Sequence, residues 1–379
     1  MTETRFSSLR LVQFRSYGKA ALELDGRPIV LTGQNGSGKT SILEAVSMFS
    51  PGRGMRRAVS DEMACRRNKV GWKVSAELVA GGRGWEVATW FPGSAGRRVE
   101  IEGKAARQVD LGRLLRVVWA VPAMDRLWSE SGDGRRRFLD RLAMGFFPAH
   151  SEDVIAYEKA MRERNRLIRE RRRVGAWMDG LEQQMAERGT AIARSRRRTI
   201  ERLKAAGKES DSGFPSARLT VISPDGGNGN TEDPKELAEA LKLGRHRDFA
   251  AGRTLVGPHR SDLLAVHETS GMEARNCSTG EQKALLLSII LANARAISED
   301  CGGPPVMLLD EIAAHLDAGR RDRFFSEILR LKVQAWLTGT QSEYFNSLGL
   351  DTQWFEVSET NGLSTVVETK APSRPLPQG

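Results

Sequence analysis

Residues 33–40, Gly-Gln-Asn-Gly-Ser-Gly-Lys-Thr, constrain the fold of this chain more than any other segment. The run fits the pattern G-x-x-x-x-G-K-[ST] between an apolar strand at 29–32 and a helix that starts near Ser41. Such glycines let backbone N–H groups surround a phosphate at a helix N-terminus, so the segment predicts a nucleoside-triphosphate site; a glycine-rich turn is the alternative. We assign the phosphate cradle to Gly33, Gln34, Asn35, Gly36, Ser37, Gly38, Lys39 and Thr40, with Lys39 on the β- and γ-phosphates and Thr40 on Mg²⁺.

A second motif, Val-Met-Leu-Leu-Asp-Glu at 306–311, is an apolar strand that ends in two acids. Asp310 is placed to orient Mg²⁺ through a water, and Glu311 to polarise the attacking water as a general base. An apolar strand ending in two acids is common, and the phosphate loop upstream is what favours the catalytic interpretation. The expected catalytic residues are Glu311, Asp310 and Lys39, and the expected cofactors are ATP and Mg²⁺.

A third motif, Cys-Ser-Thr-Gly-Glu-Gln-Lys at 277–283, precedes a long apolar helix. Ser278 and Gly280 offer a hydroxyl and N–H groups to a second phosphate, although a plain helix N-cap is the alternative. In this context the run resembles the Leu-Ser-Gly-Gly-Gln signature of ABC-type ATPases, which contacts the γ-phosphate on the opposite subunit. Positions 277, 279 and 281 depart from that pattern. Residues 314–317, which end in Asp317, resemble the D-loop of the same superfamily.

Two other parts of that superfamily have no counterpart in the sequence. The Q-loop would fall near 118–125, where no Gln occurs, and Thr338-Gly339-Thr340 stands where many relatives carry a switch histidine. The missing histidine predicts slow or differently gated hydrolysis. A lone histidine, His259, lies in the segment 255–262, and lone histidines are more often structural than catalytic.

Blocks along most of the chain resemble the RecF family of bacterial recombination mediators. They are residues 11–17 (LVQFRSY), 43–45, 52–56, 134–140, Tyr157 with 163–165, 255–262 and 310–317. A Gly-Pro of the family is replaced here by Gly-Asp-Gly at 132–134. The resemblance implies an SMC-like head without a long coiled coil. It also implies an ATP-dependent homodimer on double-stranded DNA and single/double-strand junctions, with weak DNA-stimulated ATPase activity. RecR and RecO are the implied partners in loading RecA at gaps, in replication, repair of DNA damage and the SOS response.

The expected fold class is α/β, an ABC-type ATPase head with a mixed sheet and P-loop core plus an inserted α-helical lobe. The strand patterns of the first third predict one mixed sheet around the P-loop helix, with a hairpin at 72–91. Residues 135–205 are rich in helix-forming side chains. We therefore expect residues 1–125 and 251–370 to form the head, residues 126–250 the helical lobe, and residues 371–379 a disordered tail.

A net charge of +10, from 58 Lys and Arg against 48 Asp and Glu, favours polyanionic partners. Arg162, Arg166, Arg169 and Arg173 recur at helical spacing and are the candidate DNA contacts, to phosphates rather than to bases. Arg164 lies near this stripe, and a second cluster follows at 194–198. The alternative is a solvated charged face, because Glu163 and Glu170 are interleaved.

Several classes of protein are disfavoured. No apolar run approaches the roughly 20 residues of a membrane span, the N-terminus lacks a signal-peptide layout, and the three cysteines have no C-x-x-C spacing. We expect a cytoplasmic, nucleoid-associated protein with no membrane partner. The nucleotide subunit of an ABC transporter would be a shorter chain with the Q-loop Gln and the switch histidine. A DNA scaffold that holds ATP without useful turnover is the remaining alternative.

Overall fold

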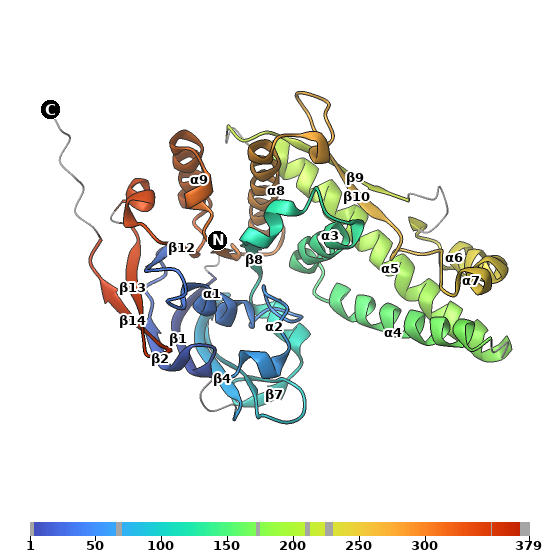
Figure 1. The fold of residues 1–379 in the computed structure, drawn as a ribbon, viewed down its shortest axis with the longest axis horizontal. Coiled ribbons are helices and arrows are strands. Elements are labelled where there is room, and N and C mark those ends of the chain that lie inside the picture. Colours follow the sequence, from blue (N-terminus) through green and yellow to red (C-terminus); the bar gives the residue numbers. More distant parts are fainter. Residues whose placement is uncertain are drawn as a thin grey trace. The chain divides into compact units, whose positions relative to one another are not determined.

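The computed structural model describes residues 4–65, 70–171, 175–208, 213–223, 230–349 and 351–371, and only the backbone of His315. Arg173 and residues 372–379 of the expected tail lie outside this part of the chain. The chain divides into two compact units. Unit 1 comprises Met1–Asp125, Glu209–Phe214 and Leu286–Gly379, and unit 2 comprises Arg126–Lys208 and Pro215–Leu285. Figure 1 labels many of the helices and strands of each unit.

Unit 1 contains an antiparallel sheet with the strand order β2-β1-β4-β5-β6-β7. The strands are β1 (Arg5–Phe14), β2 (Tyr17–Glu23), β4 (Trp72–Ala80), β5 (Arg83–Phe91), β6 (Arg98–Ile101) and β7 (Lys104–Ala106). Buried and exposed positions alternate along β4, as in a sheet with one face on a core. The predicted hairpin is confirmed, because β4 and β5 pair around Gly81 and Gly82, both at positive φ.

A second sheet of unit 1 has the order β14-β13-β3-β12-β11-β8. The strands are β3 (Ile29–Thr32), β8 (Val117–Ala120), β11 (Val306–Leu309), β12 (Ala335–Gly339), β13 (Gln353–Thr360) and β14 (Leu363–Thr369). All pairs are parallel except β13–β14. The expectation of one sheet for the first third of the chain was wrong. β3 is buried along most of its length and pairs with β12 and β13. The strands before and after it in the sequence, β1, β2, β4 and β5, belong to the antiparallel sheet.

The helices of unit 1 cover these sheets, and a continuous apolar core fills the space against α1. Phe6 of β1 packs edge-on against Trp336 of β12 with the ring centroids 6.0 Å apart. The helices are α1 (Lys39–Ser47), α2 (Gln108–Leu114), α9 (Ala318–Leu331) and the greater part of α8 (Thr279–Asp300), with 3-10 turns at Ser60–Met63, Ala313–His315 and Ser342–Leu348. A further 3-10 turn, Pro122–Arg126, ends at the boundary between the units.

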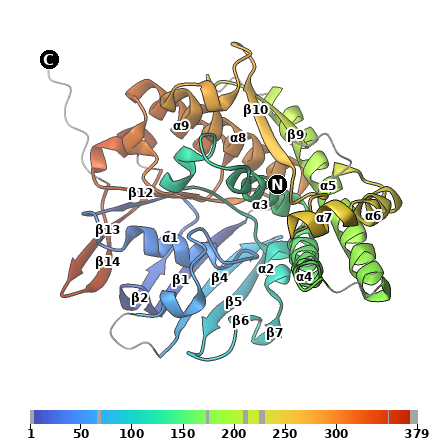
Figure 2. The same cartoon turned by 45° about the vertical axis from the view of Figure 1, so that its right-hand side comes forward.

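Unit 2 is mainly helical. Its elements are α3 (Gly132–Phe146), α4 (His150–Arg169), α5 (Gly175–Lys208), β9 (Ala217–Ile222), α6 (Pro234–Leu243), α7 (Arg245–Ala251), β10 (Asp262–His267) and a 3-10 turn at Ala274–Asn276. Helices α4 and α5 lie side by side in both views (Figures 1 and 2). Their core includes Tyr157, Met185 and Leu237.

The expected α/β fold class is confirmed. Residues 251–285, which we assigned to the head, group instead with the helical unit. The physical reason is that β10 pairs along its whole length with β9, which follows α5. No helix in the described part of the chain has both the length and the apolar composition needed to cross a bilayer.

Candidate nucleotide site

The phosphate loop connects the end of β3 to the start of α1 in unit 1. Gly33, Gly36 and Gly38 have φ angles of 151°, 82° and 111°, in the region that side-chain-bearing residues rarely adopt. A Cβ on Gly33 would lie 2.1 Å from the carbonyl oxygen of Val357, and one on Gly38 would lie 2.4 Å from Oγ of Ser364. Glycine is therefore required at these two positions both by conformation and by the close approach of β13 and β14.

Lys39 folds back over its own loop. Its Nζ donates hydrogen bonds to the carbonyl oxygens of Gly33 at 2.7 Å and Gln34 at 2.8 Å. Burial lowers the pKa of Lys39, and the carboxylates of Glu311 and Asp310 oppose that change. An ammonium held in this way can exchange two carbonyl oxygens for phosphate oxygens with little movement of its side chain.

Thr40 and Asp310, the two expected Mg²⁺ ligands, are in contact where β11 and β12 end and α1 begins. Thr40 Oγ1 at the start of α1 donates to Asp310 Oδ1 at 2.9 Å, and Thr338 Oγ1 at the end of β12 donates to the same oxygen at 2.8 Å. No group of three or more His, Cys, Asp or Glu side chains that could hold a metal occurs among the described residues. A hydroxyl and a carboxylate nevertheless fit Mg²⁺, which prefers oxygen ligands and completes its shell with substrate phosphates and water.

Glu311, the expected general base, has a left-handed backbone with φ 53°. Such a conformation costs about 1–3 kcal/mol for a residue other than glycine and persists only where neighbours hold it. The holding contact is a hydrogen bond from the Glu311 amide to Thr338 Oγ1 at 2.9 Å. Thr338 thus positions both acids, a role that sequence reasoning missed because it noted only the absence of a histidine there.

Hydrogen bonds that hold the phosphate loop and α1 in place were also not predicted, although residues 11–17 resemble the RecF family. Arg15 Nε and Nη2 donate to the two carboxylate oxygens of Glu44 at 2.7 and 2.6 Å, and Glu44 is fully buried on α1. Tyr17 donates its hydroxyl to the carbonyl oxygen of Gly38 at 3.2 Å, and Ser364 donates to that of Ser37 at 2.5 Å. The phosphate loop and its helix are therefore fixed by β14 and by the β1–β2 turn.

The signature-like segment lies at the start of α8, and Ser278 and Gly280 belong to unit 2. Glu281 accepts hydrogen bonds on Oε2 from Ser278 Oγ at 2.7 Å and from the Ser278 amide at 2.8 Å. The Glu281 amide in turn points to Ser278 Oγ at 3.4 Å. This is a capping box, the N-cap arrangement that the sequence left open as an alternative, and it leaves Ser278 exposed.

Asp317, the expected D-loop acid, caps helix α9 in unit 1. Its Oδ1 accepts a hydrogen bond from the Arg320 amide at 2.9 Å, and its side chain is exposed. The cap fixes the backbone around Asp317, and the exposed carboxylate remains accessible to a second protein chain.

The basic face of α4 carries Arg162, Arg166 and Arg169 as exposed side chains. Arg166 pairs with Glu163 at 2.5 Å, and Arg162 lies 4.0 Å from Glu158. Acids of the same helix therefore neutralise part of this face, as expected from the interleaved glutamates.

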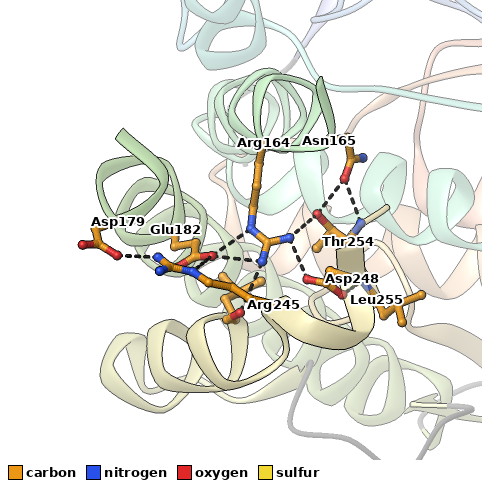
Figure 3. Close-up of polar contacts among 9 residues, drawn as sticks. Arg164, Asn165, Asp179, Glu182, Arg245, Asp248, Thr254 and Leu255 are labelled. Atoms are coloured by element: carbon orange, nitrogen blue, oxygen red, sulfur yellow. Dashed lines mark hydrogen bonds and ion pairs between the residues drawn. The ribbon is translucent and has the colours of Figure 1, made fainter. Parts of the chain in front are cut away.

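Arg164, which lies near this stripe in the sequence, faces the interior instead (Figure 3). It forms ion pairs with Glu182 at 2.9 Å and Asp248 at 2.7 Å, and it donates to Thr254 Oγ1 at 2.8 Å. Burial raises the pKa of Asp248, and Arg164 opposes that rise. Arg164 therefore joins α4, α5 and α7. Arg196, in the second cluster, is also buried and pairs with Asp140 at 2.8 Å.

Comparison with known proteins agrees with this architecture. Residues 5–364 match the family described as RecF/RecN/SMC N terminal domain. A protein of Allorhizobium ampelinum named DNA replication and repair protein RecF is 45% identical over 369 residues, which cover 94% of this chain and 98% of the relative. This chain belongs to the RecF family. A RecF of Agrobacterium fabrum is 47% identical over 364 residues, covering 93% and 96% of the two chains.

Solved structures share the fold of this RecF-family chain. One, described as the recombination mediator protein RecF-ATP in the RecFOR pathway, has a TM-score of 0.80 at 20% identity and covers 97% of this chain and 100% of its own. The Smc head domain of Pyrococcus furiosus has a TM-score of 0.55 at 16% identity and covers 97% and 96%. The predicted SMC-like head is thereby confirmed as a fold.

Proposed function

We propose that this RecF-family chain is a slow ATPase of DNA replication and repair whose ATP-bound form dimerises on double-stranded DNA. The observation that carries the proposal is the meeting of the loop at 33–40, the Thr40–Asp310 pair and Glu311 at one end of the parallel sheet. The curated relatives, named DNA replication and repair proteins, and the solved RecF-ATP structure support it.

In the proposed reaction, Lys39 binds the β- and γ-phosphates, while Thr40 and Asp310 hold Mg²⁺. A Mg²⁺ ion held by these two side chains would supply charge neutralisation to the phosphates. Glu311 orients and deprotonates the attacking water, and Thr338 keeps the backbone of Glu311 in place. Slow hydrolysis then returns the protein to its ATP-free state.

The homodimer follows from the need to enclose the γ-phosphate from both sides. Ser278, Gly280 and Asp317 of a second copy are the proposed contacts. Ser278 is exposed at the start of α8, where N–H groups favour anions, and Asp317 is exposed at the start of α9. In the ATP-bound dimer, Ser278 Oγ would exchange the Glu281 carboxylate for a phosphate oxygen.

RecR and RecO are the proposed partners of this dimer at gaps and junctions, where it helps to load RecA in the cytoplasm.

DNA binding is proposed for the exposed face of α4. Arg166→Glu combined with Arg169→Glu should weaken binding to unrelated duplexes alike and should lower the salt slope by about 0.9 for each phosphate that is no longer neutralised. Lys242→Glu combined with Arg247→Glu makes the same charge change at exposed sites on α6 and α7 and serves as the control. Equal losses in both variants would replace the α4 site by a general effect of net charge.

A DNA-stimulated hydrolysis assay tests the proposed function as a whole. We expect slow release of phosphate by the wild type that rises when duplex is added, and none from Glu311→Gln at unchanged ATP affinity. Tight ATP binding with no turnover, with or without duplex, would point to an ATP-holding scaffold. Turnover that ignores DNA would contradict the assignment.

A further inference from the structure

A pocket of about 340 Å³ lies within unit 2, and its lining includes no residue assigned to the nucleotide. Its walls come from α3, α4, α5 and the loop that precedes β10. Three blocks that resemble the RecF family and have no role in the nucleotide site meet there: residues 134–140, Tyr157 with 163–165, and 255–262. These three blocks, which have no role in the proposed ATPase reaction, therefore contribute to one pocket.

The pocket is rich in arginine. Its lining includes Arg136, Arg137, Arg196, Arg253 and Arg260. The acids in the lining are Asp133, Asp140 and Glu158. Five cations against three carboxylates leave a positive balance within a concave site, where fixed charge attracts anions more strongly than on an open surface.

The acids are also engaged with other groups. Asp140 accepts from Arg196 Nε and Nη2 at 2.8 and 2.9 Å and lies 2.9 Å from Nε2 of His150. Asp133 pairs with Arg137 on its own helix. Arg253, by contrast, is exposed and its side chain has no acidic partner among the described residues. Its charge is open to an anion from outside the chain.

The loop that carries Arg253 and Arg260 is held rigidly. Asn165 Oδ1 accepts from both the amide and the hydroxyl of Thr254 at 2.7 Å, next to Arg164 (Figure 3). The carbonyl oxygen of Thr254 accepts from His259 Nε2 at 3.1 Å, and His259 Nδ1 lies 2.7 Å from the hydroxyl of Tyr157. Rigid placement of charged groups before binding reduces the entropy cost of recognising a ligand.

Glycine is required at one point of this loop. Gly257 has a φ of 134°, and a Cβ there would lie 2.2 Å from the Tyr157 hydroxyl. His259 remains neutral, because burial lowers its pKa to about 4 and Arg260 acts in the same direction. Burial also lowers the pKa of Arg136, and the neighbouring Arg196 lowers it further. A bound anion would relieve this crowding of positive charge.

We propose that this pocket binds a phosphate group of a nucleic-acid backbone, with Arg136, Arg253 and Arg260 as the contacting cations. The inference rests on the proposed function, since it names a second place at which the same DNA is held. Guanidinium groups match phosphate oxygens in a forked geometry. The aromatic rings in the lining, Tyr157 and His259, lie against each other, with the Tyr157 hydroxyl 2.7 Å from His259 Nδ1. We therefore expect contacts to phosphate rather than stacking on bases, and binding that is indifferent to sequence.

The test is fluorescence anisotropy of a labelled duplex over a salt series, with ATP present. Arg253→Gln combined with Arg260→Gln should lower the salt slope by about 0.9 for each phosphate that these arginines neutralise, and should weaken binding at every salt concentration. Lys242→Gln combined with Arg247→Gln, which removes equal charge outside the pocket, should leave binding near the wild type. Arg253→Gln alone removes an exposed side chain, so its smaller loss is readable even if the double variant folds poorly.

The outcomes separate the inference from the function on which it rests. Wild-type protein that fails to bind duplex would overturn the proposed function itself. Wild-type binding with an unchanged slope in both pocket variants would overturn the pocket alone. Calorimetric titration with inorganic phosphate adds a third arm. Phosphate binding that is lost in Arg253→Gln while duplex binding is unchanged would make the pocket a small-anion site and refute the backbone assignment.

Discussion

Replacing Thr338 by valine tests how the two acids of the nucleotide site are held. The substitution keeps the shape of the side chain but removes the hydroxyl that donates to Asp310 at 2.8 Å and accepts from the Glu311 amide at 2.9 Å. Thr338 is buried, and Asp310 is 5% exposed, so water cannot readily replace either bond.

The expected loss of stability follows from the two bonds. A hydrogen bond to a charged group contributes about 1.5–3 kcal/mol and a neutral one about 0.5–1.5 kcal/mol, so Thr338→Val should lose about 2–4.5 kcal/mol locally. Glu311 would also be without the hydrogen bond that maintains its left-handed backbone. A displacement of about 1 Å at a catalytic group costs on the order of 10²-fold in rate, and we expect turnover to fall by that factor while ATP binding through Lys39 persists.

Two measurements report the effect. Hydrogen exchange of the peptide that contains Glu311 should quicken, since its amide loses its acceptor, and steady-state hydrolysis should drop. Thr340→Val changes the same residue type two positions later at an exposed site and serves as the control. Unchanged exchange and turnover in Thr338→Val, or equal losses in Thr340→Val, would refute the positioning role.

Other substitutions test the roles of Lys39 and Ser278, the backbone of Glu311 and the titration of His259. Lys39→Ala should abolish ATP binding, whereas Ser278→Ala should keep binding but lose dimerisation and turnover; equal loss of affinity in both would show that Ser278 acts in its own subunit. Glu311→Gly should be more stable than Glu311→Ala by about 1 kcal/mol in denaturant unfolding, because only alanine retains the strain of a positive φ, and equal stability would contradict that strain. The pKa of His259 is lowered to about 4 from 6.5, so the unfolded chain takes up a proton at a higher pH than the folded chain does. The free energy of unfolding should therefore fall by about 3 kcal/mol as pH drops from 6.5 to 4. The free energy of unfolding of His259→Gln, measured by denaturant titration over the same pH range, should lack this pH dependence.

The parts of the molecule that were predictable from sequence are those set by local pattern. The phosphate loop needs glycine at fixed positions between a strand and a helix, and the hairpin of β4 and β5 needs alternation on both sides of a tight turn. The strand before Asp310 is likewise a continuous apolar run, as expected for a buried parallel strand.

The parts that were not predictable depend on interactions between distant segments. Thr338 acts on acids 27 and 28 residues away, and Arg15 binds a glutamate 29 residues away. Arg164 shares helical spacing with exposed arginines but meets Glu182 and Asp248 only once α5 and α7 pack against α4. Charge at helical spacing therefore could not show which arginines face DNA and which stabilise the interior.

ATP binding, before hydrolysis, is expected to join two copies of this chain. Light scattering of Glu311→Gln tests this dimerisation, because the variant retains the phosphate loop but lacks the proposed base. We predict the mass of a dimer with ATP and Mg²⁺ and that of a monomer with ADP. A dimer of equal stability in the absence of any nucleotide would refute ATP-driven dimerisation.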